Sequence, residues 1–170
     1  MTYYGRKLSG VKDNGLGRDG NMINLESVDR KILDYETGLH RFMEKEALFK
    51  KFLLKFTDDQ SFPHLKENIE KQDCEEAFRE AHTLKGVAAN LALNELSEAA
   101  SELTELLRAK KLEEAKEKLP MLEEAYGRVQ SLLAELKDWE KDYISDADRY
   151  GVSAEEKYSF AGAPFFYYVI

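Results

Sequence analysis

Apolar residues recur at steps of three and four positions from Asn24 to about Trp139, the spacing that places side chains on one face of a helix. No part of this stretch alternates apolar with polar residues or is rich in β-branched residues, so no sheet is expected there. The pattern predicts helices over residues 25–41, 45–56, 61–72, 73–91, 95–110 and 112–139. We expect the first helix to break near Gly38 and the last to kink or restart at Pro120.

Helix starts are expected at residues whose side chains can accept a hydrogen bond from an unpaired backbone N–H of the first turn. Asp73 and Asn94 are predicted to cap the helices that follow them, and Ser61, ahead of Pro63, is predicted to start the helix over 61–72. The buried stripe of the helix over 45–56 is predicted to contain Leu48, Phe49, Phe52, Leu53 and Phe56.

Short connections between consecutive helices favour antiparallel neighbours. The predicted fold is therefore all-α, an up-and-down antiparallel four-helix bundle with additional short N-terminal helices. Residues 1–24, which hold five of the ten glycines, are expected to form a flexible leader. The bundle is assigned to residues 25–140, and residues 141–170, with the apolar run Phe165–Ile170 at their end, to a tail of unknown role.

Composition and charge narrow the class of protein. The chain has 25 Lys and Arg residues against 33 Asp and Glu residues, a net charge of -8, which does not favour nucleic acid as a partner. No apolar run approaches the roughly 20 residues that cross a bilayer, and no signal-peptide core is seen near the start. We expect a monomeric cytoplasmic protein that contacts neither nucleic acid nor a membrane.

The residues that most often bind metals are few. Cys74 is the only cysteine, so a thiolate-rich site cannot be built, and a reduced thiol without a chemical role is expected. The three histidines, His40, His64 and His82, never fall three or four residues apart, so no pair can chelate a metal from one helix face. We therefore expect no metal site, and expect His40 and His64 to be surface residues near helix ends.

The helix over 73–91 places one histidine opposite its apolar face. Its apolar stripe consists of Ala77, Ala81, Leu84, Ala88 and Leu91. At about 100° per residue, His82 lies about 140° from the centre of that stripe, so its imidazole is expected to point into solvent. At cellular pH a large fraction of imidazole is neutral and keeps a lone pair on one ring nitrogen, which can attack phosphorus.

Three neighbours of His82 support that chemistry. Gly86 lies in the interior of the predicted helix, where glycine costs about 1 kcal/mol relative to alanine, so a reason other than helix stability is needed. Gly86 and Ala89 leave the surface beyond His82 low enough for a phosphoryl group or another backbone to approach. Lys85 can bring its ammonium to the same place. On spacing alone, an ordinary surface histidine beside a chance lysine and glycine is an equal alternative.

The segment 81–91, AHTLKGVAANL, resembles the signature of histidine-containing phosphotransfer (HPt) domains of bacterial phosphorelays. The resemblance covers about residues 25–136 and includes DYETGLHRF at 34–42 and NEL at 94–96. The sequence departs from the family at Ala92, where relatives often have glycine after Asn-Leu. At that point the helix is expected to run on slightly.

The resemblance implies a function and a role for each matching residue. His82 would be the phosphoacceptor, Lys85 would help to hold the phosphoryl oxygens, and Gly86 would give the partner access. Such modules have no ATP site and no kinase activity of their own; they carry a phosphoryl group between aspartates of receiver domains. The implied partners are response-regulator receiver domains and a hybrid or sensor histidine kinase. The receiver would supply Mg²⁺, and this chain would bind no cofactor.

The docking surface for a receiver is expected to surround His82. Transient signalling interfaces combine a small apolar centre with a charged rim. The expected contributors are Arg79, Lys85, Gly86 and Ala89, with an apolar patch from Leu39 and Met43. Equal rise along two neighbouring helices also places Thr104 level with His82, where its hydroxyl could bond the imidazole. A solvated Thr104 is the alternative.

Two other functions compete with phosphotransfer. A sensor histidine kinase fits poorly, because Thr83 follows the histidine where the kinase helix has an acidic residue, and no glycine-rich nucleotide-binding segment is present. A receiver-docking scaffold or phosphate sink on the same bundle is the second alternative. It does not require His82, Lys85 and Gly86 together.

Overall fold

The computed structural model describes residues 25–149, with the side chains of residues 25–138, and its elements are all helical. The α-helices are α1 (Tyr35–Arg41), α2 (Glu46–Lys55), α3 (Ser61–Glu70), α4 (Cys74–Asn90), α5 (Asn94–Arg108) and α6 (Leu112–Arg149). Two 3-10 turns, η1 (Leu25–Ser27) and η2 (Phe56–Asp58), lie before α1 and after α2. The all-α class is confirmed, and none of the described helices has the length and apolar character of a membrane span.

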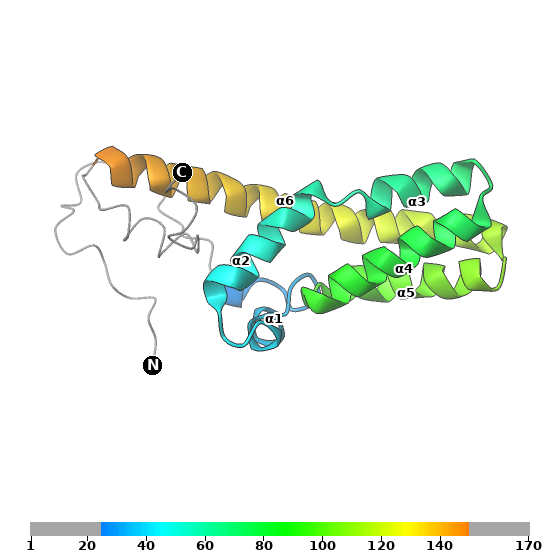
Figure 1. Cartoon of the computed structure of the whole chain (residues 1–170), viewed down its shortest axis with the longest axis horizontal. Helices are drawn as coiled ribbons and strands as arrows, with labels where there is room; N and C mark the ends of the chain where they lie inside the picture. Colours follow the sequence, from blue (N-terminus) through cyan, green and yellow to red (C-terminus); the bar gives the residue numbers. More distant parts are fainter. Residues whose placement is uncertain (1–24, 150–170) are drawn as a thin grey trace, which may run out of the picture.

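Helices α3 to α6 form a bundle in which each helix packs on the next. α4 contacts both α3 and α5, and α5 contacts α6. Connections of three residues join these helices, and Figure 1 shows them running along one common direction with alternating sense. α1 and α2 lie at the end of the bundle where α4 ends, and α6 continues beyond them (Figure 1).

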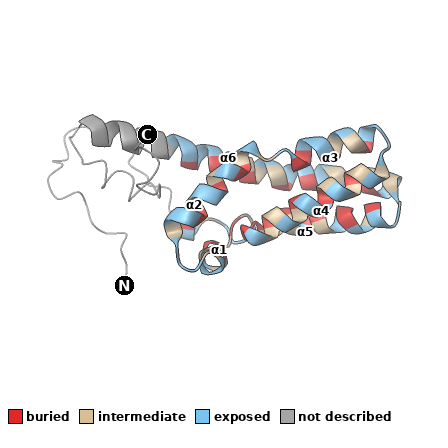
Figure 2. Ribbon diagram, viewed as in Figure 1, coloured by how far each residue is buried: buried red, intermediate tan, exposed pale blue. Residues whose placement is uncertain are grey.

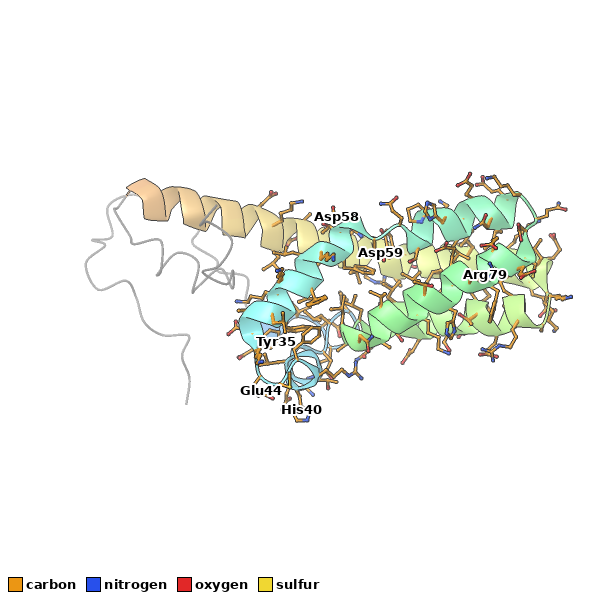
Figure 3. The ribbon with its side chains drawn as sticks, viewed as in Figure 1. Tyr35, His40, Glu44, Asp58, Asp59 and Arg79 are labelled. Atoms are coloured by element: carbon orange, nitrogen blue, oxygen red, sulfur yellow. The ribbon has the colours of Figure 1, made fainter. Side chains whose placement is uncertain are left out.

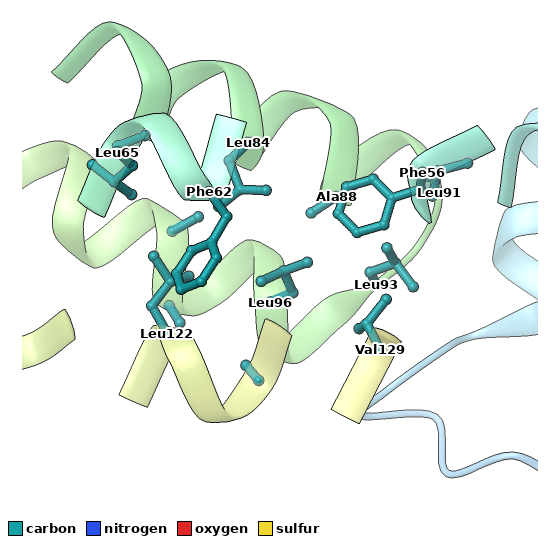
Figure 4. Packing of buried hydrophobic residues seen from close by; sticks show 14 of the residues in the cluster. Phe56, Phe62, Leu65, Leu84, Ala88, Leu91, Leu93, Leu96, Leu122 and Val129 are labelled. Atoms are coloured by element: carbon teal, nitrogen blue, oxygen red, sulfur yellow. The ribbon is translucent and has the colours of Figure 1, made fainter. Parts of the chain in front are cut away.

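The core is built from the apolar stripes of these helices. α4 contributes Leu84 and three alanines, Ala77, Ala81 and Ala88, all without exposed area. Figure 4 shows Leu84 and Ala88 among side chains from α3, α5 and α6, and Figure 2 shows the exposed residues on the outer faces. Burial of one leucine side chain contributes about 1.5–3 kcal/mol, so this stripe decides which face of α4 points outward.

The helix predicted over 25–41 is wrong in its first half. The 3-10 turn η1 is followed by non-helical chain up to Asp34, whose carboxylate accepts the N–H of Thr37 at 3.1 Å and starts α1. Gly38 does not break α1. It is buried inside the helix, and a Cβ there would collide with the ring of Phe49 in α2. Glycine therefore allows α1 and α2 to come close together.

Two of the three predicted helix starts are confirmed in position: α3 begins at Ser61, and Asp73 caps α4, because its carboxylate accepts the N–H of Glu76 at 3.1 Å. Ser61 is not a cap; it is the first residue of α3, and its own N–H donates to the carboxylate of Asp59 at 2.9 Å. Asn94 is also the first residue of its helix rather than the cap. Its side-chain amide donates to the carbonyl of Arg30 at 3.0 Å and so ties α5 to the segment before α1.

Two further expectations are wrong. Phe49, Leu53 and Phe56 are buried, but Leu48 and Phe52 are exposed. α6 also continues through Pro120 without a restart and reaches Arg149, beyond the helix end predicted at Trp139. The predicted leader (1–24) and most of the predicted tail (150–170) lie outside the described residues.

Candidate functional site

His82 lies in the middle of α4 with its side chain exposed. The stripe on the opposite face is buried as predicted: Ala77, Ala81, Leu84 and Ala88 have no exposed area and Leu91 is 3% exposed. Packing of that stripe against α3 and α5 therefore holds His82 on the outer surface of the bundle. The prediction that the imidazole points into solvent is confirmed.

The immediate surroundings of the imidazole are aromatic rather than polar. The ring of Phe78, one turn earlier in α4, is stacked on it with centroids 6.0 Å apart and an interplanar angle of 27°. The hydroxyl of the adjacent Thr83 donates to the carbonyl of Arg79 at 3.0 Å. Among residues 25–138, no side chain makes a hydrogen bond or ion pair with His82. The exposed His82 side chain therefore has no polar partner among these residues.

The two cations predicted near His82 differ in their partners. Arg79 makes ion pairs of 2.7 Å with both Glu75 and Glu76, so its charge is already compensated within its own helix. Lys85 is half-buried and has no ion pair with any of the described side chains. Lys85 is therefore the better placed of the two to meet a phosphoryl group. Figure 3 shows Arg79 on the outer side of α4.

Gly86 leaves open space beside His82. A Cβ built at Gly86 would meet nothing within 4 Å among the described residues, so packing within this chain gives no reason for glycine there. Ala89 is half-buried, and its carbonyl accepts a hydrogen bond from the guanidinium of Arg41 at the end of α1. The surface from His82 to Ala89 therefore lacks large side chains on its outermost line.

Thr104 does not support the imidazole. It has no exposed area, and its hydroxyl donates to the carbonyl of Ala100 at 2.6 Å. Thr104 lies on the buried face of α5 beside Leu103 and Leu107, because the register of α5 turns this position toward the core. The solvated alternative is equally wrong.

Leu39 and Met43 lie apart from His82, at the end of α4. Leu39 is half-buried and packs against the hydrophobic core, so only part of its side chain is open to a partner. Met43 is 69% exposed on the turn after α1. Figure 3 shows its neighbours His40 and Glu44 at this end of the molecule. A partner that covered both His82 and Met43 would have to span about 10 Å or more along α4.

A groove between α1, α2 and α4 was not predicted from the sequence. It encloses about 600 Å³, and its lining includes Phe42, Phe52, Phe56, Val87 and Asn90. Phe52 is 44% exposed, and its ring lies 5.4 Å from that of Phe42. The lining also carries positive and negative side chains, from Arg41, Lys55, Asp58 and Asp59. The signal for it in the sequence is the phenylalanine-rich segment 45–56, whose periodicity predicts a buried stripe instead.

The other residues with metal-binding or redox chemistry have ordinary roles. His40 and His64 are exposed and lie 3.2 Å from Glu44 and 3.8 Å from Glu80. The thiol of Cys74 donates to the carbonyl of Leu107 at 3.2 Å. In the described part of the chain, no three His, Cys, Asp or Glu side chains gather as a metal site.

Comparison with known families gives one match. A family model described as the Hpt domain matches residues 55–139, half of the 170-residue chain. The matched region begins at the end of α2 and includes η2, α3, α4 and α5 and most of α6. It contains His82, Lys85 and Gly86 but not α1. No curated protein and no solved structure matches the chain.

Proposed function

Starting from the fact that the chain belongs to the Hpt domain family, we propose that His82 carries a phosphoryl group between receiver-domain aspartates in a two-component phosphorelay. Domains of this family are phosphocarriers in phosphorelays rather than enzymes. The observation that carries the assignment to His82 is its exposure on α4 beside an open surface at Gly86. His40 and His64 lie outside the motif.

The proposed step forms one bond and breaks one. The lone pair of a neutral imidazole nitrogen of His82 attacks the phosphorus of an aspartyl phosphate on the receiver. The N–P bond forms while the P–O bond breaks, and the electron pair of that bond leaves on the aspartate carboxylate. The other imidazole nitrogen keeps its proton. Transfer to a second receiver is the same step in reverse, so this chain needs no nucleotide.

The neighbours of His82 supply positioning and charge. Phosphoryl transfer depends mainly on in-line geometry and on stabilisation of the phosphoryl oxygens. In this proposal the ammonium of Lys85, which has no ion-pair partner among the described side chains, binds one of those oxygens. The same proposal assigns the Mg²⁺ that assists the transfer to the acidic pocket of the receiver, as the family resemblance implies.

The proposed docking surface combines the open line of α4 with an apolar edge. Gly86 and Ala89 form the line along which the receiver approaches His82. Met43 and the exposed Phe52 form the apolar edge, with Leu39 contributing only its exposed part. Arg79 takes part only if the receiver competes with Glu75 and Glu76 for its guanidinium. We place this monomeric carrier in the cytoplasm, with receivers and a hybrid or sensor histidine kinase.

The direct test is transfer of ³²P from a phosphorylated receiver with Mg²⁺ to the full chain. We expect an acid-labile label on the wild type and only background on His82→Gln, because glutamine has no nucleophilic ring nitrogen. His64→Gln and His40→Gln are matched controls, since both residues are exposed histidines outside the motif, and both variants should accept label as the wild type does.

The receiver-docking scaffold gives a different result in the same experiment. Binding of the receiver without label on the wild type would favour the scaffold, and label that persists on His82→Gln would assign the phosphoryl group to another residue.

A further inference from the structure

The imidazole of His82 has one described neighbour that can orient it. Long and aromatic side chains in an α-helix point back toward the N-terminus, onto the residue three or four positions earlier. For His82 the residue four positions earlier is Phe78, and the two rings are stacked with centroids 6.0 Å apart. The neighbouring hydroxyls of Thr83 and Thr104 donate to backbone carbonyls instead. The aromatic contact therefore takes the place of a hydrogen bond.

Phe78 is itself held in place from a second helix. Its ring is half-buried against the hydrophobic core. The guanidinium carbon of Arg108, near the end of α5, lies 5.5 Å from the centroid of the Phe78 ring, and Arg108 pairs with Glu105 at 2.9 Å. The ring under His82 is thus fixed by α4, α5 and the core, while His82 itself is exposed.

Stacking of this kind suits a nucleophilic imidazole. The lone pair of the attacking nitrogen lies in the plane of the ring, at its edge, whereas Phe78 contacts the face of the ring. The contact therefore restricts rotation about the side-chain torsions without covering the lone pair. Holding a reacting group in one orientation removes entropy that the transfer step would otherwise have to remove.

From this geometry we propose that Phe78 is a positioning residue for phosphotransfer, which holds the His82 imidazole with its edge toward the incoming phosphorus. The inference rests on the proposed function of His82. Phe78 acts through His82 and does not touch the phosphoryl group. Arg108 acts one step further away, by holding the Phe78 ring.

The test compares Phe78→Leu with Phe78→Tyr in the full chain. Aromatic contacts are worth enough to change the population of one ring orientation about three- to tenfold, so Phe78→Leu should lower the transfer rate at saturating phosphorylated receiver by about that factor. The receiver concentration that gives half the maximal rate should not change, because Phe78 lies beneath the imidazole. Phe78→Tyr keeps a ring in the same place and should retain the wild-type rate.

A spectroscopic measurement tests the same contact without a partner. In wild type, the ring current of Phe78 should shift the NMR signals of the His82 imidazole C–H protons, and Phe78→Leu should remove that shift while Phe78→Tyr retains it. Phe62→Leu is the matched control. It removes another aromatic stack, with Tyr126 of α6 at 4.3 Å, from the bundle core, and should change neither the His82 signals nor the transfer rate.

The inference and the proposed function fail in different ways. Wild-type protein that accepts no label contradicts the proposed function, whatever the NMR signals show. If the wild type accepts label, a wild-type transfer rate in Phe78→Leu overturns the positioning role alone. So does a loss of rate in Phe62→Leu and Phe78→Tyr that is as large as the loss in Phe78→Leu.

Discussion

At the scale of single residues, three glycines in helices serve different purposes. Gly38 is required by packing, because a Cβ would collide with Phe49. Gly86 and Gly127 have open space where a Cβ would be, so neither is required by packing among the described residues. Glycine has a low helix propensity, so each of the three destabilises its helix relative to alanine. Packing therefore gives no reason for Gly86 or Gly127, and Gly86 differs from Gly127 in lying beside His82, where access of a partner is proposed.

Substitution of Gly86 should separate stability from function. Gly86→Ala should raise the free energy of unfolding by about 1 kcal/mol, because alanine is the better helix former and the added methyl meets nothing. Gly38→Ala should lower it, since Phe49 would have to move. Urea denaturation followed by circular dichroism measures both changes. A loss of stability in Gly86→Ala would show that glycine is needed for the fold after all.

A larger side chain at the same position tests access. Gly86→Gln should leave the fold intact but slow transfer from a phosphorylated receiver by about tenfold or more, because the side chain would stand beside His82 where the partner approaches. Gly127→Gln is the matched control on α6, where space is equally open, and it should transfer normally. Equal rates in the two variants would contradict the access argument.

At the scale of elements, four helices end in the same way without a glycine. In each, the second residue after the helix takes a positive φ, and the next residue donates its N–H to a carbonyl of the last turn, which is the Schellman arrangement. The positive-φ residues are Met43, Gln72, Ala92 and Lys110. After α1, Glu44 has a positive φ as well as Met43. The closing bonds run from Glu44 to Leu39, Asp73 to Asn68, Leu93 to Ala88 and Lys111 to Leu106, at 2.9–3.1 Å.

This shared ending corrects the expectation for Ala92. α4 does not run on where relatives often have glycine; it ends at Asn90, and Ala92 takes a φ of 56°. The N–H of Asp34 donates to the carbonyl of Ala92 at 3.0 Å, so the turn also holds the start of α1. Ala92 thus adopts the left-handed conformation that glycine favours.

Glycine should therefore stabilise the exposed turns. Gln72→Gly and Lys110→Gly should each raise the free energy of unfolding by about 0.5 to 1 kcal/mol. A positive φ strains any residue with a Cβ, and the relief of that strain is larger than the backbone entropy that glycine loses on folding. Both side chains are exposed, so no packing is lost.

Ala109→Gly is the control, because Ala109 has a φ of -78° and gains nothing from glycine. It should lower the free energy of unfolding in the same urea titrations. Equal changes in Ala109→Gly and Lys110→Gly would contradict the argument.

At the scale of the whole molecule, the N-terminal segment is joined to the bundle at the turn between α4 and α5. The N–H of Glu95 donates to the carbonyl of Lys31 at 2.8 Å, and Arg41 donates to Ala89. α1 in turn packs on α2, whose rings line the groove beside α4. The start of α1 therefore helps to shape the groove at the end of α4.

The carboxylate of Asp34, which caps α1, makes the free energy of unfolding depend on pH. The backbone N–H of Thr37 lowers the pKa of Asp34 below its ordinary value, because it donates to the ionised carboxylate. A lowered folded-state pKa gives stability that is present above the unfolded pKa and lost as the pH falls through the folded value. Asp34→Ala should cost about 1 kcal/mol at neutral pH, as the loss of a helix cap does.

The difference in stability between wild type and Asp34→Ala should shrink as the pH falls below about 4. Thermal unfolding of both proteins between pH 3 and pH 7 measures it. A constant difference across that range would mean that the carboxylate charge contributes nothing to the cap.

Local periodicity in the sequence was enough to determine the all-helical class and the exposure of His82. The positions of Ala77, Ala81, Leu84 and Ala88 define the buried face of α4 whatever packs on it, so the opposite face is also defined. The motif from Ala81 to Leu91 in turn pointed to the family. These properties depend on residues within a few turns of one another.

Only the tertiary structure decided what surrounds that histidine. The sequence predicts Phe52 in a buried stripe and Thr104 beside the exposed histidine, yet Phe52 is exposed in a groove and Thr104 is fully buried. The contact of Arg108 in α5 with the Phe78 ring likewise depends on how α5 lies against α4. The stack of Phe78 with His82, by contrast, joins residues one turn apart within α4. Burial at the edge of a stripe is set by the neighbouring helix that covers it, and the register between two helices is not encoded in either helix alone.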